Sequence, residues 1–226
     1  MEAIAIPKGF KVTPEQFEQL AYAEQLARME LTKDGESIVM SPTGGEAGRK
    51  NRRLTQQIGI WTDEDGTGEA FDSSTVFTLS NGARRSPDVS WIKLDKWNAL
   101  TLKEKQGFPP VVPNFVIELI APSRFAARWS VPTFLWNGEA LQSLKERRWT
   151  PVHGPSDLKN QRYEDLQAKM LEYIDNGVQL GWLIEPSAKT VEIYRMDKQV
   201  EILNNPQTLS GEDVLPGFVL DLSNIF

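Results

Sequence analysis

Two acidic residues occupy predicted strands in which neutral or apolar side chains are the usual choice. Asp88 follows Pro87 at the start of a strand expected over 88–93, and Glu118 lies inside the apolar run 115–120. Burying an ionised carboxylate among apolar neighbours is costly unless a cation or hydrogen bonds compensate it. Strand alternation could instead turn Glu118 toward solvent, so the run alone leaves both interpretations open.

The chemistry that suits these residues is metal-assisted hydrolysis of a phosphodiester. Such a reaction needs acidic oxygens to hold Mg²⁺, a cation near the scissile phosphate and a positioned water. Asp88 and Glu118 could bind the metal, together with the backbone carbonyl of Leu119. Lys169 could polarise the phosphate and assist the attack of water.

Lys169 lies on a helix expected over 161–176, which ends at an Asn-Gly pair. Asp165, Lys169 and Tyr173 follow each other at intervals of four and therefore share one face of that helix. The same spacing is typical of an exposed ion pair beside a buried tyrosine. Helical spacing alone does not decide between that arrangement and a catalytic lysine.

The elements that must position these residues follow the order αββα, several strands, then αββ. Thr13-Pro14-Glu15-Gln16 reads as a capping box at the start of the first helix, and Asp34-Gly35 favours a hairpin turn. The region 97–108 is polar and is expected to be irregular or briefly helical. The other helices and extended segments follow from hydrophobic periodicity: helices at 13–28, 44–61 and 161–176, and extended segments at 29–33, 36–40, 75–79, 88–93, 115–120, 180–185, 190–195 and within 211–226.

Residues 124–156 do not fit this pattern. They hold three of the seven Trp, the only His and a local charge of five basic minus two acidic residues, or +3. Similar triplets flank them, Ala121-Pro122-Ser123 and Gly154-Pro155-Ser156. We interpret 124–156 as an insertion in an otherwise single domain that spans 1–226.

Composition narrows the possible chemistry further. The 226 residues are 40% hydrophobic, enough for one core, and they include no Cys and one His, His153. Thiol catalysis, disulfides and Cys- or His-rich metal sites are therefore excluded. The net charge of −6 argues against a nonspecific nucleic-acid coat protein but not against an enzyme that gathers carboxylates around a cation. With no membrane-length apolar run and no secretory signal in 1–11, we expect a cytoplasmic protein that does not contact membranes.

Several strings along the chain resemble the Uma family, which is classed among the PD-(D/E)xK, restriction-endonuclease-like endonucleases. Each string is weak alone, but their order and spacing are specific, and together they span nearly the whole chain. They are Ser41-Pro42 with Gly44-Gly45-Glu46, Ser86-Pro87-Asp88-Val89, the run 116–123 (VIELIAPS), 165–169 (DLQAK), 177–186 (GVQLGWLIEP) and 211–218 (GEDVLPGF).

The resemblance implies an α+β (α/β) fold, a restriction-endonuclease-like mixed β-sheet core flanked by helices. It assigns metal binding to Asp88 and Glu118. The third residue of the usual motif would fall at Ile120, which is uncharged here, and Lys169 matches the position where similar members carry the lysine on the following helix. Glu46 matches a frequent additional acidic residue, although a Glu in the first turn of a helix is equally well explained by the helix dipole.

The function expected on this basis is Mg²⁺- or Mn²⁺-dependent cleavage of DNA, with a homodimer cutting both strands. The alternative is an inactive nuclease-like fold that binds nucleic acid or protein without cleavage. A fold by itself does not establish activity, so the two hypotheses separate at the site. The presence of Asp88, Glu118 and Lys169 together favours the enzyme.

Overall fold

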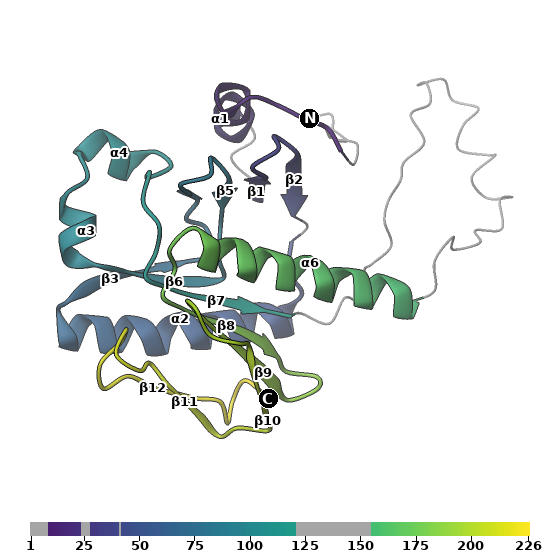
Figure 1. Cartoon of the computed structure of the whole chain (residues 1–226), viewed down its shortest axis with the longest axis vertical. Coiled ribbons are helices and arrows are strands. Elements are labelled where there is room, and N and C mark those ends of the chain that lie inside the picture. Colours follow the sequence, from purple (N-terminus) through teal and green to yellow (C-terminus); the bar gives the residue numbers. More distant parts are fainter. Residues whose placement is uncertain (1–8, 24–27, 41, 121–154) are drawn as a thin grey trace, which may run out of the picture.

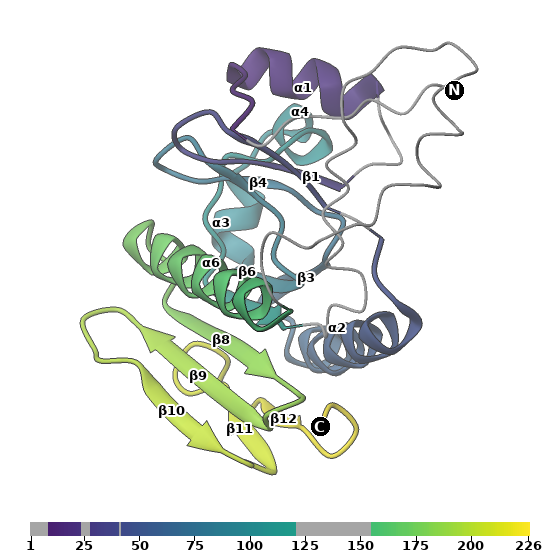
Figure 2. The same cartoon turned by 90° about the vertical axis from the view of Figure 1, so that its right-hand side faces the viewer.

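The computed structural model describes residues 9–23, 28–40, 42–120 and 155–226, and the side chains of its last long helix from Arg162 onward. Figures 1 and 2 show two long helices, α2 (Gly45–Asp65) and α6 (Pro155–Asp175), that flank a central sheet. Among the described residues, no helix is long and apolar enough to cross a membrane.

The central sheet has six strands in the order β10-β9-β8-β7-β6-β3. The pair β7 and β8 is parallel and every other neighbouring pair is antiparallel, so the sheet is mixed, as the family resemblance implies. The strands are β3 (Gly68–Asp72), β6 (Val89–Lys93), β7 (Phe115–Leu119), β8 (Leu180–Glu185), β9 (Thr190–Arg195) and β10 (Glu201–Asn204).

Strand β7 is central and buried on both faces. Phe115 and Ile117 belong to the core that contains Leu54 and Ile58 of α2. Val116, one residue along, belongs to the core on the α6 side. Because successive side chains alternate between faces, Glu118 points to the side of Val116. The sheet therefore presents this carboxylate to α6 and not to water.

A second, four-stranded sheet with the order β2-β1-β5-β4 lies near the N-terminal helix α1 (Pro14–Ala23). The helix begins at the predicted capping box, in which Thr13 Oγ1 accepts a hydrogen bond from the Gln16 amide and the Gln16 side chain accepts one from the Thr13 backbone N–H. Met29 and Leu31 share a core with Phe17 of α1. The strands are β1 (Arg28–Leu31), β2 (Ser37–Met40), β4 (Phe77–Thr78) and β5 (Arg84–Arg85).

Four short elements complete the described fold. The polar region 97–108 is partly helical, with α3 (Leu94–Asn98) and α4 (Leu102–Gln106). The hairpin of β11 (Thr208–Ser210) and β12 (Val219–Asp221) contributes Leu209 and Leu220 to the core beneath α2. These apolar contacts bring the C-terminal segment onto the α2 face of the central sheet.

Most predicted elements are present, and the differences lie at their ends. The first helix was expected to reach Arg28, but that residue opens β1 and the described helix ends at Ala23. Only Phe77–Thr78 of the strand expected at 75–79 pairs with a neighbour. Most of the predicted insertion, 124–154, lies outside the described residues. Pro155 and Ser156 already belong to α6, because Pro is well accommodated in the first turn of a helix.

Candidate active site

Asp88 directly precedes β6, and Glu118 lies on the neighbouring antiparallel strand β7. Val89 of β6 pairs with Ile117 of β7, so the next step along the ladder sets Asp88 beside Glu118. The backbone N–H of Leu119 donates to Asp88 Oδ2 at 2.9 Å. This bond ties the Asp88 carboxylate to the end of β7.

The other oxygen of Asp88 is held from α2. Asn51 Nδ2 donates to Asp88 Oδ1 at 3.0 Å. Asn51 lies one turn after Ala47 and just before Leu54, two buried residues of α2, so the helix directs it toward the sheet. Each oxygen of Asp88 thus accepts one hydrogen bond from a neutral donor, and the plane of the carboxylate is set by both.

Glu118 is buried, with 4% of its surface exposed. Its Oε1 accepts a hydrogen bond from the Tyr173 hydroxyl at 3.0 Å and lies 2.8 Å from Lys169 Nζ. Burial raises the pKa of Glu118 to about 7; Lys169 opposes this rise, whereas the neighbouring carboxylates of Asp88 and Glu30 add to it. The alternative in which Glu118 faces solvent is excluded.

Lys169 is also buried, at 9% exposure, and lies between two carboxylates. Its Nζ is 2.6 Å from Glu30 Oε1 and 2.8 Å from Glu118 Oε1. Burial alone would lower the pKa of Lys169, but the two carboxylates outweigh it and the net pKa is raised. Lys169 therefore stays charged and does not form the exposed ion pair that helical spacing also allowed.

Glu30 was missed by the sequence analysis. It is 3% exposed on β1, where Met29 and Leu31 face α1 and Glu30 faces the opposite way. Besides Lys169 it accepts the Ser86 backbone N–H at 2.9 Å and pairs with Arg85 at 3.1 Å. Burial favours the neutral acid, yet Lys169 and Arg85 lower the pKa of Glu30 below its ordinary value. The signal that could have found it is the one used for Glu118, an acid between two apolar residues of a predicted strand.

Glu118, Lys169 and Glu30 form a buried network of charges, and Arg85 extends this network to the C-terminal half of α6. Its Nε lies 2.6 Å from Glu172 Oε2, and its NH1 pairs with Glu30. Burial opposes the charge on Arg85, but Glu30 and Glu172 raise its pKa. The network joins β1, β5, β7 and α6, so the position of Lys169 depends on all four elements.

Glu46 and Leu119 are the other two residues that the sequence analysis assigned to the site. Glu46 is exposed in the first turn of α2, where its carboxylate pairs with Arg49 at 2.6 Å and with Lys50 at 3.9 Å. The Arg49 hydrogen bond lowers the pKa of Glu46. These contacts pair the Glu46 carboxylate with two basic residues of its own helix. Leu119 contacts Asp88 through its N–H, and its carbonyl stays a predicted ligand.

Asp88 and Glu118 are the carboxylates best placed to share a cation. Within the described ranges, no group of three or more Asp, Glu or His side chains is arranged to hold a metal ion. Lys169 and Arg85 already neutralise Glu30, whereas Asp88 receives only neutral donors. A hard cation here would have two carboxylates and would complete its shell from backbone oxygens and water, as Mg²⁺ often does.

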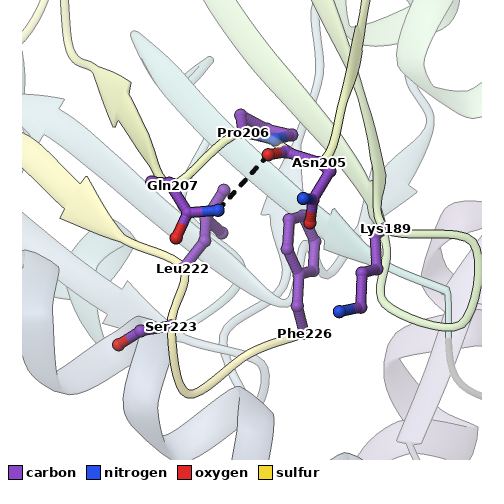
Figure 3. A pocket seen from close by; sticks show the side chains of 7 residues that line it. All are labelled: Lys189, Asn205, Pro206, Gln207, Leu222, Ser223 and Phe226. Carbon is purple, nitrogen blue, oxygen red and sulfur yellow. Dashed lines mark hydrogen bonds between the residues drawn. The ribbon is translucent and has the colours of Figure 1, made fainter.

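The structure also has a small pocket of about 180 Å³ near the C-terminus (Figure 3). It lies between the turn at Lys189, the loop at Asn205 and the segment that ends at Phe226, and the Gln207 side chain donates to the Asn205 carbonyl across it. It shares no lining residue with the cluster around Glu118. The candidate chemistry is therefore assigned to the β6–β7–α6 cluster and not to this pocket.

Comparisons with known proteins agree with this architecture. A crystal structure described as a "putative nuclease belonging to DUF820 from Anabaena variabilis ATCC 29413" superposes with a TM-score of 0.60 at 16% identity, covering 88% of this chain and 89% of that chain. At that identity the match concerns the fold alone. A search of curated proteins finds no significant match.

A family model extends the comparison to the sequence. The model named Uma2, described as "Putative restriction endonuclease", matches residues 14–126 and 157–223. The match covers most of the chain, includes Asp88, Glu118 and Lys169, and leaves out 127–156. On this evidence the chain belongs to the Uma2 family.

Proposed function

We propose that this protein is a Mg²⁺- or Mn²⁺-dependent DNA endonuclease whose active site consists of Asp88, Glu118 and Lys169. The observation that carries the proposal is the convergence of these residues from β6, β7 and α6 on one partly buried site. Membership of a family described as restriction endonucleases supports nuclease-like chemistry.

The residues present fit a divalent cation. Burial raises the pKa of Glu118 and the Asp88 carboxylate adds to this rise, so two acidic groups lie together where a cation would relieve their repulsion. The contacts of Glu118 with Lys169 and Tyr173 both fall on Oε1, and we assign Oε2 to the metal. Asp88 and the Leu119 carbonyl complete the predicted ligands. When bound, the ion would polarise the phosphate and lower the pKa of a bound water.

The protein's own groups supply orientation and charge. Lys169, which keeps its proton, can place a positive charge beside the developing negative charge of the scissile phosphate. Glu30 fixes the ammonium of Lys169 at 2.6 Å, and Tyr173 fixes the Glu118 carboxylate at 3.0 Å. A site held this way loses little energy to reorganisation when the phosphate charge develops.

Helix α2 supports a DNA substrate despite the net charge of −6. Four basic residues, Arg49, Lys50, Arg52 and Arg53, flank Asn51, the residue that holds Asp88. Clustered Lys and Arg supply the phosphate affinity of nucleic-acid-binding proteins. These residues adjoin Asn51 in the sequence, and Arg49 and Arg52 are exposed on α2.

The test is cleavage of plasmid DNA with Mg²⁺ or Mn²⁺, comparing the wild type with Asp88→Ala. Cleavage should fall by at least about 100-fold, because the variant loses a metal ligand. Asp63→Ala is the matched control and should cleave normally, because Asp63 is an exposed acid near the far end of α2. DNA binding without cleavage by the wild type would favour the alternative, an inactive nuclease-like binding module.

Glu46 stays a predicted auxiliary acid of this site. Because its carboxylate is exposed and pairs with Arg49, Glu46→Gln should reduce cleavage much less than Asp88→Ala. The same plasmid assay measures both. An equal loss in the two variants would place Glu46 among the essential residues.

A further inference from the structure

Asn51 has an unusual environment for an amide side chain on the inner face of a helix. Its Nδ2 donates to Asp88 at 3.0 Å, but its Oδ1 is buried and has no hydrogen-bond donor among the described residues. An unpaired buried acceptor costs about 1–3 kcal/mol. Such an atom in a native protein calls for a partner, and water or an ion is the usual one.

The orientation of the amide follows from its neighbour. A carboxylate only accepts hydrogen bonds, so the NH₂ group of Asn51 must face Asp88 and the oxygen must point elsewhere. Asp88 accepts hydrogen bonds on both oxygens, from Asn51 and from the Leu119 N–H. The amide oxygen of Asn51 therefore adds a neutral acceptor beside the Asp88 carboxylate.

We propose that Asn51 is a positioning residue of the metal centre. Its Nδ2 holds the Asp88 carboxylate in the orientation that binds the cation, and its Oδ1 accepts a hydrogen bond from a water bound to that cation. This inference rests on the proposed function and adds a residue to it. Groups that orient metal ligands in this way typically contribute about 10–100-fold to metal affinity.

The test uses the full chain and Mn²⁺ as the probe, with binding measured by isothermal titration calorimetry. Asn51→Leu keeps a similar volume and removes both hydrogen-bonding groups; Asn51→Ala serves if the leucine variant fails to fold. The expected result is a Mn²⁺ affinity lowered by at least about tenfold. Thr55→Ala is the control, because Thr55 donates to the Asn51 backbone carbonyl one turn along and does not contact Asp88.

If Asn51 only stabilised the fold, these measurements would give different results from those expected for a positioning residue. If Asn51 only stabilised α2, Asn51→Leu and Thr55→Ala would lower the melting temperature alike and leave Mn²⁺ affinity unchanged. If Asn51 positions the centre, cleavage by Asn51→Leu should recover as Mn²⁺ concentration rises, whereas a folding defect would not recover.

Two outcomes would overturn the proposal, and they are distinguishable. Wild-type Mn²⁺ affinity in Asn51→Leu, with affinity lost in Asp88→Ala, would reject the role of Asn51 and leave the metal centre intact. Absence of Asp88-dependent Mn²⁺ binding in the wild type would reject the proposed metal centre and the role of Asn51 together.

Discussion

Glu30 and Lys169 are 139 residues apart in the sequence, and their side chains meet at 2.6 Å. The same ammonium lies 2.8 Å from Glu118, so one cation is shared by two buried carboxylates. Arg85 compensates Glu30 from the other side. Of these two carboxylates Glu118 is the less fully neutralised, because Glu30 has a second cation in Arg85; burial together with this incomplete compensation raises the pKa of Glu118 to about 7.

Replacing Lys169 with Met should abolish cleavage and also destabilise the fold. The loss should be on the order of 3–5 kcal/mol, because Glu30 and Glu118 would remain buried without their shared cation. Urea unfolding measures the effect. Adding Glu30→Gln to Lys169→Met should restore part of the stability, because one of the two unpaired carboxylates is then removed. If the effects of the two substitutions on the free energy of unfolding were simply additive, the shared ion pair would be contradicted. Unchanged cleavage would remove Lys169 from the proposed catalytic residues.

The stability of the protein should depend on pH through Glu118. Folding raises its pKa from 4.5 to about 7, so the folded state binds this proton more tightly than the unfolded state. The resulting stabilisation, on the order of 3 kcal/mol, is fully present below pH 4.5 and is lost as the pH rises through about 7. Glu118→Gln should therefore gain stability relative to the wild type between pH 5 and 8 in thermal melts. If the difference in melting temperature between Glu118→Gln and the wild type were the same at every pH from 5 to 8, Glu118 would not titrate in this range.

Removing residues 124–154 should leave a folded protein. The family match leaves out 127–156, and α6 begins at Pro155, so the shortened chain keeps β7 and the whole of α6. The entropy of closing the chain between β7 and α6 changes only slowly with the number of residues between them. Circular dichroism and Mn²⁺ titration of the shortened protein check the fold and the site. Loss of the folded state would show that the segment belongs to the core and is not an insertion.

The protein should form a homodimer through its C-terminal strands. Strand β10 ends the central sheet, and Ile202 and Val219 are 59% and 58% exposed. Exposed edge strands with apolar side chains favour pairing with another chain. Ile202→Lys should shift the light-scattering mass toward the monomer, whereas Leu102→Lys, at an exposed position on α4, should not. A wild-type monomer at working concentration would contradict the prediction.

Local sequence determined the elements that carry the proposed catalytic residues. The nearly continuous apolar run over 115–119 predicts a buried strand, and β7 is indeed an inner strand of the sheet whose two faces are both covered by a core. Helical spacing places Lys169 and Tyr173 on one face, and both side chains contact Glu118. These features follow from periodicities of two and about 3.6 residues, which act over a few residues and can be read along the chain.

Tertiary structure alone decided which other residues complete the site. Glu30 comes from a separate small sheet, and Asn51 from a helix 37 residues before Asp88. Neither contact follows from spacing, because it depends on how the sheets and helices pack against each other. A periodic pattern shows which face of an element is buried but not which distant side chain it meets. The apolar neighbours Met29 and Leu31 mark β1 as a strand, and only packing against β5 and α6 turns Glu30 into the partner of Lys169.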